Sequence, residues 1–346
     1  MTATLLREWR ACVLQGGGLI GMSVRGFVTA SLCLLPAAAM SDEATKPQYV
    51  LISFDGAHDN ALWDRSLKLA DETGARFTYF LSCVYLLGPE NKRLYRAPGM
   101  KAGRSNVGFA VSRDDAVTRL GHVWAAYQAG NEIASHGCGH FDGKAWTKAN
   151  WQAEFAAFSD ILKRGWAING LPAPAGWETF ATEAIHGFRA PYLSEGAGLV
   201  AALKDGRFAY NASAVTRGPQ NPSRDGDLVE FGLPMIPEGP ASKRIISMDY
   251  NLFVRHSGGI ERPSGADEFA ERTYKAFADA FNAEYSGQRR PVQMGFHFTL
   301  MNGGAYWTAL EKFAREFCVK ADVKCVSYSD WLRANPAGAQ AVAAGG

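Results

Sequence analysis

Two histidines four positions apart, His136 and His140, have the spacing in this chain that most directly suggests chemistry. They flank Gly137-Cys138-Gly139 and follow the short run 133–135, which is typical of the end of a β-strand. Their imidazoles can converge on one cation, and the two glycines favour a loop over a helix here. A histidine pair alone is equally consistent with two hydrogen-bonded surface side chains. The metal hypothesis therefore depends on the residues that accompany the pair.

Three further polar residues, Asp55, Arg189 and His297, each follow a predicted strand. Asp55 can act as a general base or a hard metal ligand, although it can equally cap a helix. Arg189 can orient a carboxylate through a bidentate pair, or it can form a structural ion pair. His297 can protonate a leaving group near neutral pH, or it can be a buried, hydrogen-bonded histidine. Their shared position at strand ends favours a single site.

Other residues near these strand ends are candidates for supporting roles. Asp59 lies within reach of the same rim as Asp55 and is either a metal ligand or a helix cap. The backbone N–H of Tyr192 is a candidate oxyanion donor. The candidate substrate contacts are Pro191, Tyr192, Asn302 and Trp307. Asn302 and Trp307 can instead be ordinary helix packing.

From residue 48 onward, the sequence pattern alternates between strand and helix. Strands are predicted at 49–54, 77–81, 132–135, 185–188, 208–212, 292–296 and 323–326, and helices at 60–73, 112–130, 147–170, 266–285, 306–317 and 328–332. Residues 227–250 are predicted to form a β-rich insertion. Such alternation indicates a parallel sheet, either open or closed into a barrel. In a barrel, functional residues gather at the carboxyl ends of the strands. The predicted strand ends here carry Asp55, His136, Arg189 and His297.

Composition is that of a globular protein: 346 residues, 47% hydrophobic and 20% charged, with a net charge of +2. This charge gives no indication of nucleic-acid binding. Residues 1–40 resemble a secretory signal, with 1–21 as a candidate upstream extension because Met22 is a more usual start. We therefore expect a periplasmic or extracellular protein without a membrane span after processing; an uncleaved anchor is the alternative. The Ala/Gly-rich tail, 335–346, is expected to be disordered.

Four cysteines follow the signal-like segment, an even number that suggests disulfides in an exported chain. Cys318 and Cys325 are close in sequence, and Cys83 and Cys138 lie at the ends of neighbouring predicted strands. The alternative is that Cys138 is a metal ligand. We favour the pairs Cys83–Cys138 and Cys318–Cys325, because Cys83 would otherwise lack a partner.

With these residues in place, the chain resembles the polysaccharide deacetylases, the NodB-homology enzymes of carbohydrate esterase family 4. Residues 53–56 (S-F-D-G) resemble the family's T-F-D-D-G, residues 136–140 are similar to H-[ST]-x-x-H, and residues 189–192 resemble R-x-P-[YF]. His297 fits the late histidine motif, and the resemblance covers residues 48–333. The runs F-D-G-A and R-A-P-Y-L, together with residues 248–251 (M-D-Y-N), resemble the chitin-deacetylase-like branch.

The resemblance implies a single catalytic domain, a distorted (β/α)7 barrel, that removes acetyl groups from N- or O-acetylated oligo- or polysaccharides. It also implies a divalent metal, usually zinc, held by one Asp and two His. Carried over to this sequence, His136 and His140 are the metal ligands and Asp55 is the general base. Arg189 orients that base, and His297 is the general acid.

One position departs from the family pattern, because Gly56 stands where the second Asp of the first motif is the carboxylate ligand. Loss of a charged ligand should weaken metal binding. Asp59 is the expected replacement, with Asp55 as the alternative. The departure also leaves open a catalytically impaired barrel that binds glycans. A hydrolase acting on a non-sugar amide is a further alternative.

Overall fold

The computed structural model describes residues 46–206, 208–338 and 340–341. The chain divides into two units, Met1–Ala44 and Thr45–Gly346, and all the described residues belong to the second unit. The signal-like segment 1–40 thus lies outside the described residues. None of the helices that the structure describes is long and apolar enough to cross a membrane.

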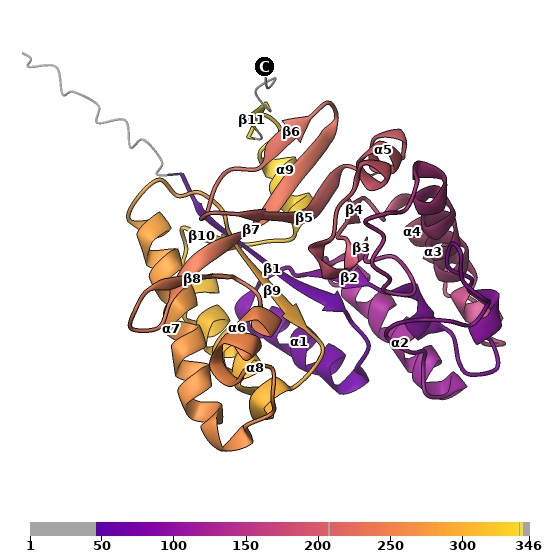
Figure 1. Ribbon diagram of the computed structural model, residues 1–346, viewed down its shortest axis with the longest axis horizontal. Helices are drawn as coiled ribbons and strands as arrows, with labels where there is room; N and C mark the ends of the chain where they lie inside the picture. The colour runs from indigo at the N-terminus through magenta and orange to yellow at the C-terminus, as the bar shows by residue number, and fades with distance from the viewer. Residues whose placement is uncertain (1–45, 207, 339, 342–346) are drawn as a thin grey trace, which may run out of the picture. The chain divides into compact units, whose positions relative to one another are not determined.

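Seven parallel strands form the curved wall of the domain, in the order β9-β1-β2-β3-β4-β5-β7 (Figure 1). Every β1 residue except the last is buried, as expected for a strand that is covered on both faces. The strands described are β1 Gln48–Gly56, β2 Thr78–Leu81, β3 Glu132–Ser135, β4 Gly187–Phe188, β5 Tyr210–Thr216, β6 Ser223–Asp225, β7 Leu228–Glu238, β8 Lys243–Ile246, β9 Val292–His297, β10 Val323–Cys325 and β11 Gln340–Ala341.

Ser247 bridges the remaining gap in the wall, between β7 and β9. Its backbone N–H donates to the carbonyl of Pro234 on β7 at 2.9 Å, and its own carbonyl accepts from Gly295 of β9 at 2.9 Å. Its hydroxyl also donates to the carbonyl of Gln293 at 2.8 Å. The fold is therefore a distorted (β/α) barrel, as the sequence predicts.

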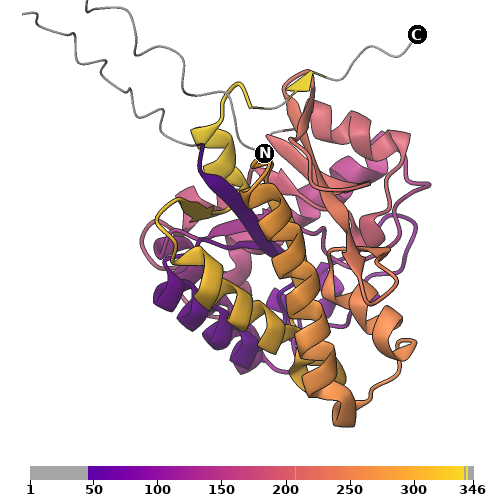
Figure 2. The ribbon, with the colours of Figure 1, turned by 90° about the vertical axis from the view of Figure 1, so that its left-hand side faces the viewer.

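Helices follow most of the wall strands, and Figure 2 shows α1, α8 and α7 side by side. The α-helices described are α1 Asn60–Thr73, α2 Arg113–Gln128, α3 Lys148–Ile168, α4 Trp177–Glu183, α5 Ala197–Asp205, α6 Asp249–Ser257, α7 Ala266–Tyr285, α8 Met301–Phe313 and α9 Tyr328–Ala334. Side chains cap the amino-terminal ends of several of them; for example, Ser112 caps α2 and Thr147 forms a capping box at α3. Short helical turns are η1 Cys83–Leu86, η2 Lys92–Leu94, η3 Pro191–Leu193, η4 Pro263–Gly265 and the π-turn η5 Ala314–Cys318.

The order of strands and helices agrees with the sequence prediction, with a few differences. Helices α4, α5 and α6 were not predicted. The β-rich segment expected at 227–250 contains β7, which is part of the wall, and β8, which pairs antiparallel to it. Within the tail expected to be disordered, Gln340–Ala341 forms the short strand β11 beside β6.

Both expected disulfides are present. Cys318 in η5 is joined to Cys325 in β10, and Cys83 in η1 is joined to Cys138 in the loop after β3. Cys138 is therefore not available as a metal ligand.

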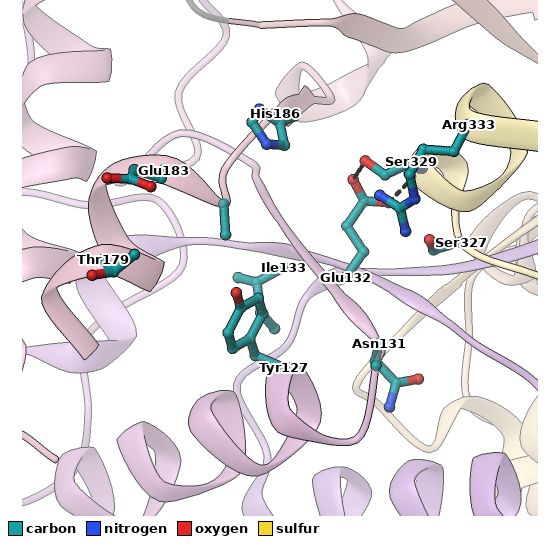
Figure 3. A pocket seen from close by; sticks show the side chains of 12 residues that line it. Tyr127, Asn131, Glu132, Ile133, Thr179, Glu183, His186, Ser327, Ser329 and Arg333 are labelled. Atoms are coloured by element: carbon teal, nitrogen blue, oxygen red, sulfur yellow. Dashed lines mark hydrogen bonds between the residues drawn. The ribbon is translucent and has the colours of Figure 1, made fainter. Parts of the chain in front are cut away.

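At the amino-terminal end of β3, Glu132 fastens the closing helix α9 to the barrel. Its carboxylate accepts hydrogen bonds from the backbone N–H of Ser329 at 3.1 Å, from the Ser329 hydroxyl, and from the Thr78 hydroxyl at 2.8 Å. Figure 3 shows Glu132 and Ser329 at the edge of a cavity of about 420 Å³ that Tyr127, Glu183 and Arg333 also line. These contacts are at the opposite end of β3 from His136.

Candidate active site

A cavity of about 660 Å³ opens at the carboxyl ends of the wall strands. Asp55, His136, His140, Tyr192 and His297 all line it, so the structure gathers five of the predicted site residues. Strand register explains part of this convergence, because Asp55 on β1 and His297 on β9 are direct pairing partners. Neighbouring residues of paired parallel strands project to the same side, which brings these two side chains to one edge.

Arg189 holds the Asp55 carboxylate inside the barrel mouth. Its Nη1 donates to Oδ1 of Asp55 at 2.7 Å and to the Ser53 hydroxyl at 2.8 Å. Its Nε donates to the carbonyl of Ala212, and its Nη2 donates to the Tyr328 hydroxyl. Burial alone would raise the pKa of Asp55, but Arg189, with smaller contributions from the two nearby histidines, holds that pKa below its ordinary value. Asp55 is therefore ionised at neutral pH.

His136 is buried and has a fixed ring orientation. Its Nδ1 lies 2.8 Å from the backbone carbonyl of Arg189, and because a carbonyl can only accept, Nδ1 carries the proton. This contact leaves Nε2 as the unprotonated nitrogen. Burial lowers the pKa of His136 to about 3, which keeps the ring neutral. A neutral imidazole with a fixed tautomer is the form that binds metals.

His140 completes the pair at the end of the same loop. Its ring centroid lies 5.0 Å from that of His136 and 4.6 Å from the ring of Tyr192. Burial lowers the pKa of His140, and its Nδ1 is buried without a hydrogen-bond partner among the described residues. The backbone is left-handed at His140 (φ 54°) and at Tyr192 (φ 60°), which non-glycine residues seldom adopt.

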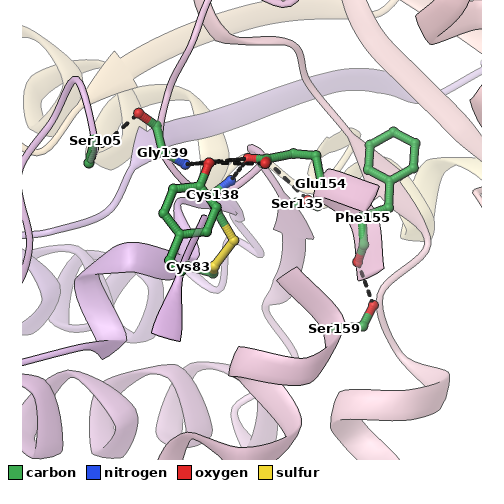
Figure 4. Close-up of a disulfide and its surroundings, with 10 residues drawn as sticks. Cys83, Ser105, Ser135, Cys138, Gly139, Glu154, Phe155 and Ser159 are labelled. Atoms are coloured by element: carbon green, nitrogen blue, oxygen red, sulfur yellow. Dashed lines mark hydrogen bonds between the residues drawn. A yellow bond between two sulfur atoms is a disulfide. The ribbon is translucent and has the colours of Figure 1, made fainter. Parts of the chain in front are cut away.

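Glu154 of α3 holds the loop between the two histidines, a role that the sequence prediction did not include. Its buried carboxylate accepts from the backbone N–H of Cys138 at 2.7 Å and of Gly139 at 3.4 Å (Figure 4). The Tyr95 hydroxyl donates to the same carboxylate and accepts from the Gly139 N–H at 3.1 Å. The Cys83–Cys138 disulfide is a second constraint on this loop.

Asp249, at the start of α6, is a second contributor that the prediction did not include. It is fully buried, and its carboxylate accepts from the backbone N–H of His297 at 2.7 Å and contacts His297 Nδ1 at 2.7 Å. Burial alone would lower the pKa of His297, but Asp249 reverses this effect, and the pKa is raised above its ordinary value. His297 Nε2 is the ring nitrogen left for a ligand.

Asp59, the expected replacement ligand, does not line the cavity. Its side chain accepts a hydrogen bond from the Leu62 N–H at 2.9 Å as the N-cap of α1. The expectation is corrected accordingly. The Asp59 carboxylate caps α1, and Asp55 is the carboxylate that lines the cavity with His136 and His140.

Three of the expected substrate contacts also need correction. Asn302 is fully buried and is held by the Ser257 hydroxyl and the Arg262 N–H, and Trp307 is buried with its indole N–H donating to the carbonyl of His297. Pro191 is buried at the start of η3 and does not line the cavity, whereas Tyr192 does. Of this set, Tyr192 alone can contact a ligand in the cavity.

The donor atoms at the histidine pair fit a divalent cation in part. Two neutral imidazoles on one cavity, one of them with an unpartnered buried nitrogen, are suitable ligands for a first-row metal. Catalytic zinc sites usually have three protein ligands, and in the described part of the chain no group of three His, Cys, Asp or Glu side chains is placed to hold a metal. The residues fit a weakly held cation better than a tightly bound one.

The signals for the two unpredicted residues were present in the sequence but indirect. Asp249 belongs to the M-D-Y-N run, which resembles the chitin-deacetylase-like branch, but that resemblance assigned no role to Asp249. Glu154 is a charged residue on the side of α3 that carries Trp151 and Phe158, and all three are buried. A carboxylate on an apolar helix face needs a partner, although the sequence does not identify that partner.

No family model matches this sequence, and the search of curated proteins finds no match. Solved structures do match. A Mycobacterium smegmatis protein assigned as a polysaccharide deacetylase aligns at 16% identity with a TM-score of 0.53, covering 88% of this chain and 96% of its own. A Pseudomonas aeruginosa PAO1 protein with the same assignment aligns at 14% identity with a TM-score of 0.51, covering 84% and 93%.

The PuuE allantoinase aligns similarly, at 14% identity and a TM-score of 0.51 over 85% of this chain and 92% of its own. Identities this low show a shared fold and no more. Together with the barrel wall, they show that this chain shares its fold with these three solved structures, two assigned as polysaccharide deacetylases and one an allantoinase.

Proposed function

We propose that this protein is a carbohydrate deacetylase, a hydrolase that removes acyl groups from the amide or ester positions of an acylated oligo- or polysaccharide. The observation that carries the proposal is the pairing of Asp55 with His297 at one cavity. The pKa of the carboxyl is lowered and that of the imidazole is raised. These directions favour the ionised carboxylate as a base and the protonated imidazole as an acid, which is the pair that acyl hydrolysis requires.

The proposed steps follow from these protonation states. Asp55, oriented by Arg189, takes a proton from a water molecule that attacks the acyl carbonyl. His297 delivers a proton from Nε2 to the leaving amine or alcohol, while Asp249 stabilises the imidazolium before transfer. The backbone N–H of Tyr192 is the proposed donor to the oxyanion. General acid and base groups of this kind each contribute roughly 10²- to 10⁴-fold to the rate.

A divalent cation, with zinc as the first candidate, is part of the proposal. His136 and His140 would hold it, and Asp55 is the carboxylate nearest to them in the cavity lining. When bound, such an ion polarises a carbonyl and makes a water molecule more acidic. Because Gly56 supplies no carboxylate, we expect weaker binding than at a site with three protein ligands.

Export to the periplasm or the extracellular space is also proposed. Two disulfides support it, since such bonds persist in oxidising compartments.

The test is acetate release from chito-oligosaccharides and acetylated xylan by the purified protein, with and without added zinc. Turnover that is lost in Asp55→Asn supports the proposal. The Gly56 substitution favours one competing function, a barrel that binds glycans without hydrolysing them. Oligosaccharide binding without release of acetate or of a longer acyl group from any substrate, under all metal conditions, would establish that alternative.

A further inference from the structure

We propose that the substrate carries an acyl group several carbons longer than acetyl, attached to a sugar that remains at the cavity mouth. This inference rests on the proposed hydrolase function and specifies its substrate class. It comes from the side chains that line the cavity beyond the catalytic groups.

Most of the remaining lining is apolar or aromatic. These residues are Tyr85, Val107, Leu193, Ile246, Met248, Tyr250, Phe253, Phe298 and Met301. The polar side chains besides the catalytic groups and Tyr192 are those of His58, Asn251 and Thr299. The described lining includes no Lys, Arg, Glu or Gln, the long polar side chains that could reach sugar hydroxyls. A chain of unsubstituted sugars would leave its hydroxyls largely unpaired in such a cavity, which is unfavourable.

The apolar part of the lining is continuous with the protein core. Met248, Phe253, Phe298 and Met301 are each at most 7% exposed. Their buried position gives the cavity an apolar floor, and methionine side chains adapt to ligands of varied shape. An acetyl group has a single methyl to bury there, whereas a longer chain removes more apolar surface from water. The volume of about 660 Å³ lies within the usual range for pockets that enclose drug-sized ligands.

The mouth of the cavity has a different character. Tyr192 is 60% exposed and Tyr250 is 53% exposed, and both line the cavity. Their rings lie beside His140 and His297 respectively, with centroid separations of 4.6 Å and 6.3 Å. Tyrosine combines an apolar ring with a polar hydroxyl and suits a boundary between apolar and wet surroundings. The arrangement fits an amphiphilic substrate, with its acyl chain on the apolar floor and its sugar between the tyrosines.

The experiment compares hydrolysis of N-acetyl-, N-butyryl-, N-hexanoyl- and N-octanoylglucosamine by the full protein. A fully buried methylene contributes up to about fourfold in kcat/KM. We expect kcat/KM to rise at least about tenfold from acetyl to hexanoyl, allowing for partial burial. A rate that is highest for acetyl, or independent of chain length, overturns the inference while leaving the hydrolase function in place.

Binding to the Asp55→Asn variant separates the two proposals. Calorimetry with N-octanoylglucosamine and N-acetylglucosamine measures chain-length dependence without turnover, and apolar burial also gives a negative heat-capacity change. Tighter binding of the octanoyl compound, with no hydrolysis of any member by the unmodified protein, would retain the substrate class and refute the proposed function. Equal binding of both compounds would refute the substrate class.

A near-isosteric pair of variants tests the cavity floor directly. Met301→Gln places an amide on the floor, so we expect the hexanoyl-to-acetyl ratio of kcat/KM to fall by about threefold or more. Met100→Gln is the matched control, because Met100 is 41% exposed and does not line the cavity. An unchanged ratio in Met301→Gln would contradict the assignment of this floor to the acyl chain.

Discussion

Asp249 and His297 are joined at two points, because the carboxylate of Asp249 contacts both the backbone N–H and Nδ1 of His297 at 2.7 Å. The backbone contact fixes the end of β9, and the ring contact leaves Nε2 for the cavity. One buried carboxylate therefore sets both the orientation and the protonation state of the proposed acid.

Asp249→Asn should move the alkaline limb of kcat/KM to lower pH. Burial lowers the pKa of His297 and Asp249 raises it, so removing the negative charge leaves the lowering effect of burial dominant. Less of the imidazole is then protonated at neutral pH, and we expect activity at pH 8 to fall about tenfold or more. The pH profile of hydrolysis measures the limb, and NMR titration of His297 measures its pKa without turnover.

The control for this variant is Asp160→Asn, which removes an exposed carboxylate on α3. It should leave the profile unchanged. An alkaline limb at the same pH in Asp249→Asn and in the unmodified protein would show that Asp249 does not tune the acid.

Asp55→Asn and Asp59→Ala should have opposite consequences. Asp55 lies in the cavity against Arg189, so its neutral replacement should lower kcat by about 10³-fold without loss of fold. Asp59 caps α1, and Asp59→Ala should cost about 1 kcal/mol in the free energy of unfolding with little change in kcat. Steady-state kinetics and urea unfolding of both variants check this pair. A large loss of kcat in Asp59→Ala would restore Asp59 as a site residue.

Gly56→Asp should strengthen zinc binding by about tenfold or more, since it adds a carboxylate beside the histidine pair. A Cβ at this position would meet Cε2 of Tyr85 at 3.8 Å, which is ordinary contact. The backbone there is left-handed (φ 83°), a conformation that Asp tolerates better than most residues. Zinc titration by calorimetry measures the change, with Gly56→Asn as the uncharged control. Equal affinities in the two variants would indicate that no cation binds next to position 56.

The barrel could be predicted from the sequence because the features that indicate it are local. They are the apolar runs, the helix caps and the residues that follow each strand. Asp55, His136, Arg189 and His297 were identifiable because parallel strands align their ends. Their partners from distant parts of the chain were not identifiable. Asp249 contacts His297 because Ser247 links β7 to β9 in the folded barrel. Trp307 was misassigned because an aromatic residue near a strand end has the same local pattern whether it faces the cavity or the core.

Glu230→Gln should stabilise the protein at alkaline pH. Burial, together with Glu195, raises the pKa of Glu230 from its ordinary value of 4.5 to about 7. A folded-state pKa above the unfolded value means that the stabilising proton is bound at low pH and is lost as pH rises through about 7. Thermal unfolding at pH 8.5 should therefore occur about 1–3 °C higher in Glu230→Gln, with no gain at pH 4.5. A similar gain at both pH values would rule out titration of Glu230 as the cause.

Glu154→Gln should disturb the histidine pair without touching either histidine. The carboxyl group accepts from two backbone N–H groups of the loop and from the Tyr95 hydroxyl, and leaving a buried donor unsatisfied costs about 1–3 kcal/mol. An amide of the same shape can keep Oε1 for the two N–H groups, but it replaces Oε2, which the Tyr95 hydroxyl also contacts, with an N–H₂ group. The loop then loses a constraint, although the Cys83–Cys138 disulfide persists.

We expect Glu154→Gln to weaken cobalt binding at the histidine pair and to lower kcat by about tenfold, because small displacements of site residues have effects of this size or larger. Cobalt titration reports on the pair directly through its visible spectrum, and thiol titration under denaturing conditions checks that both disulfides are intact. Glu178→Gln is the matched control, since Glu178 is an exposed residue of α4. If Glu154→Gln bound cobalt as the unmodified protein does, with the same thermal midpoint, the disulfide and the loop's own turns would suffice to hold the two histidines in place.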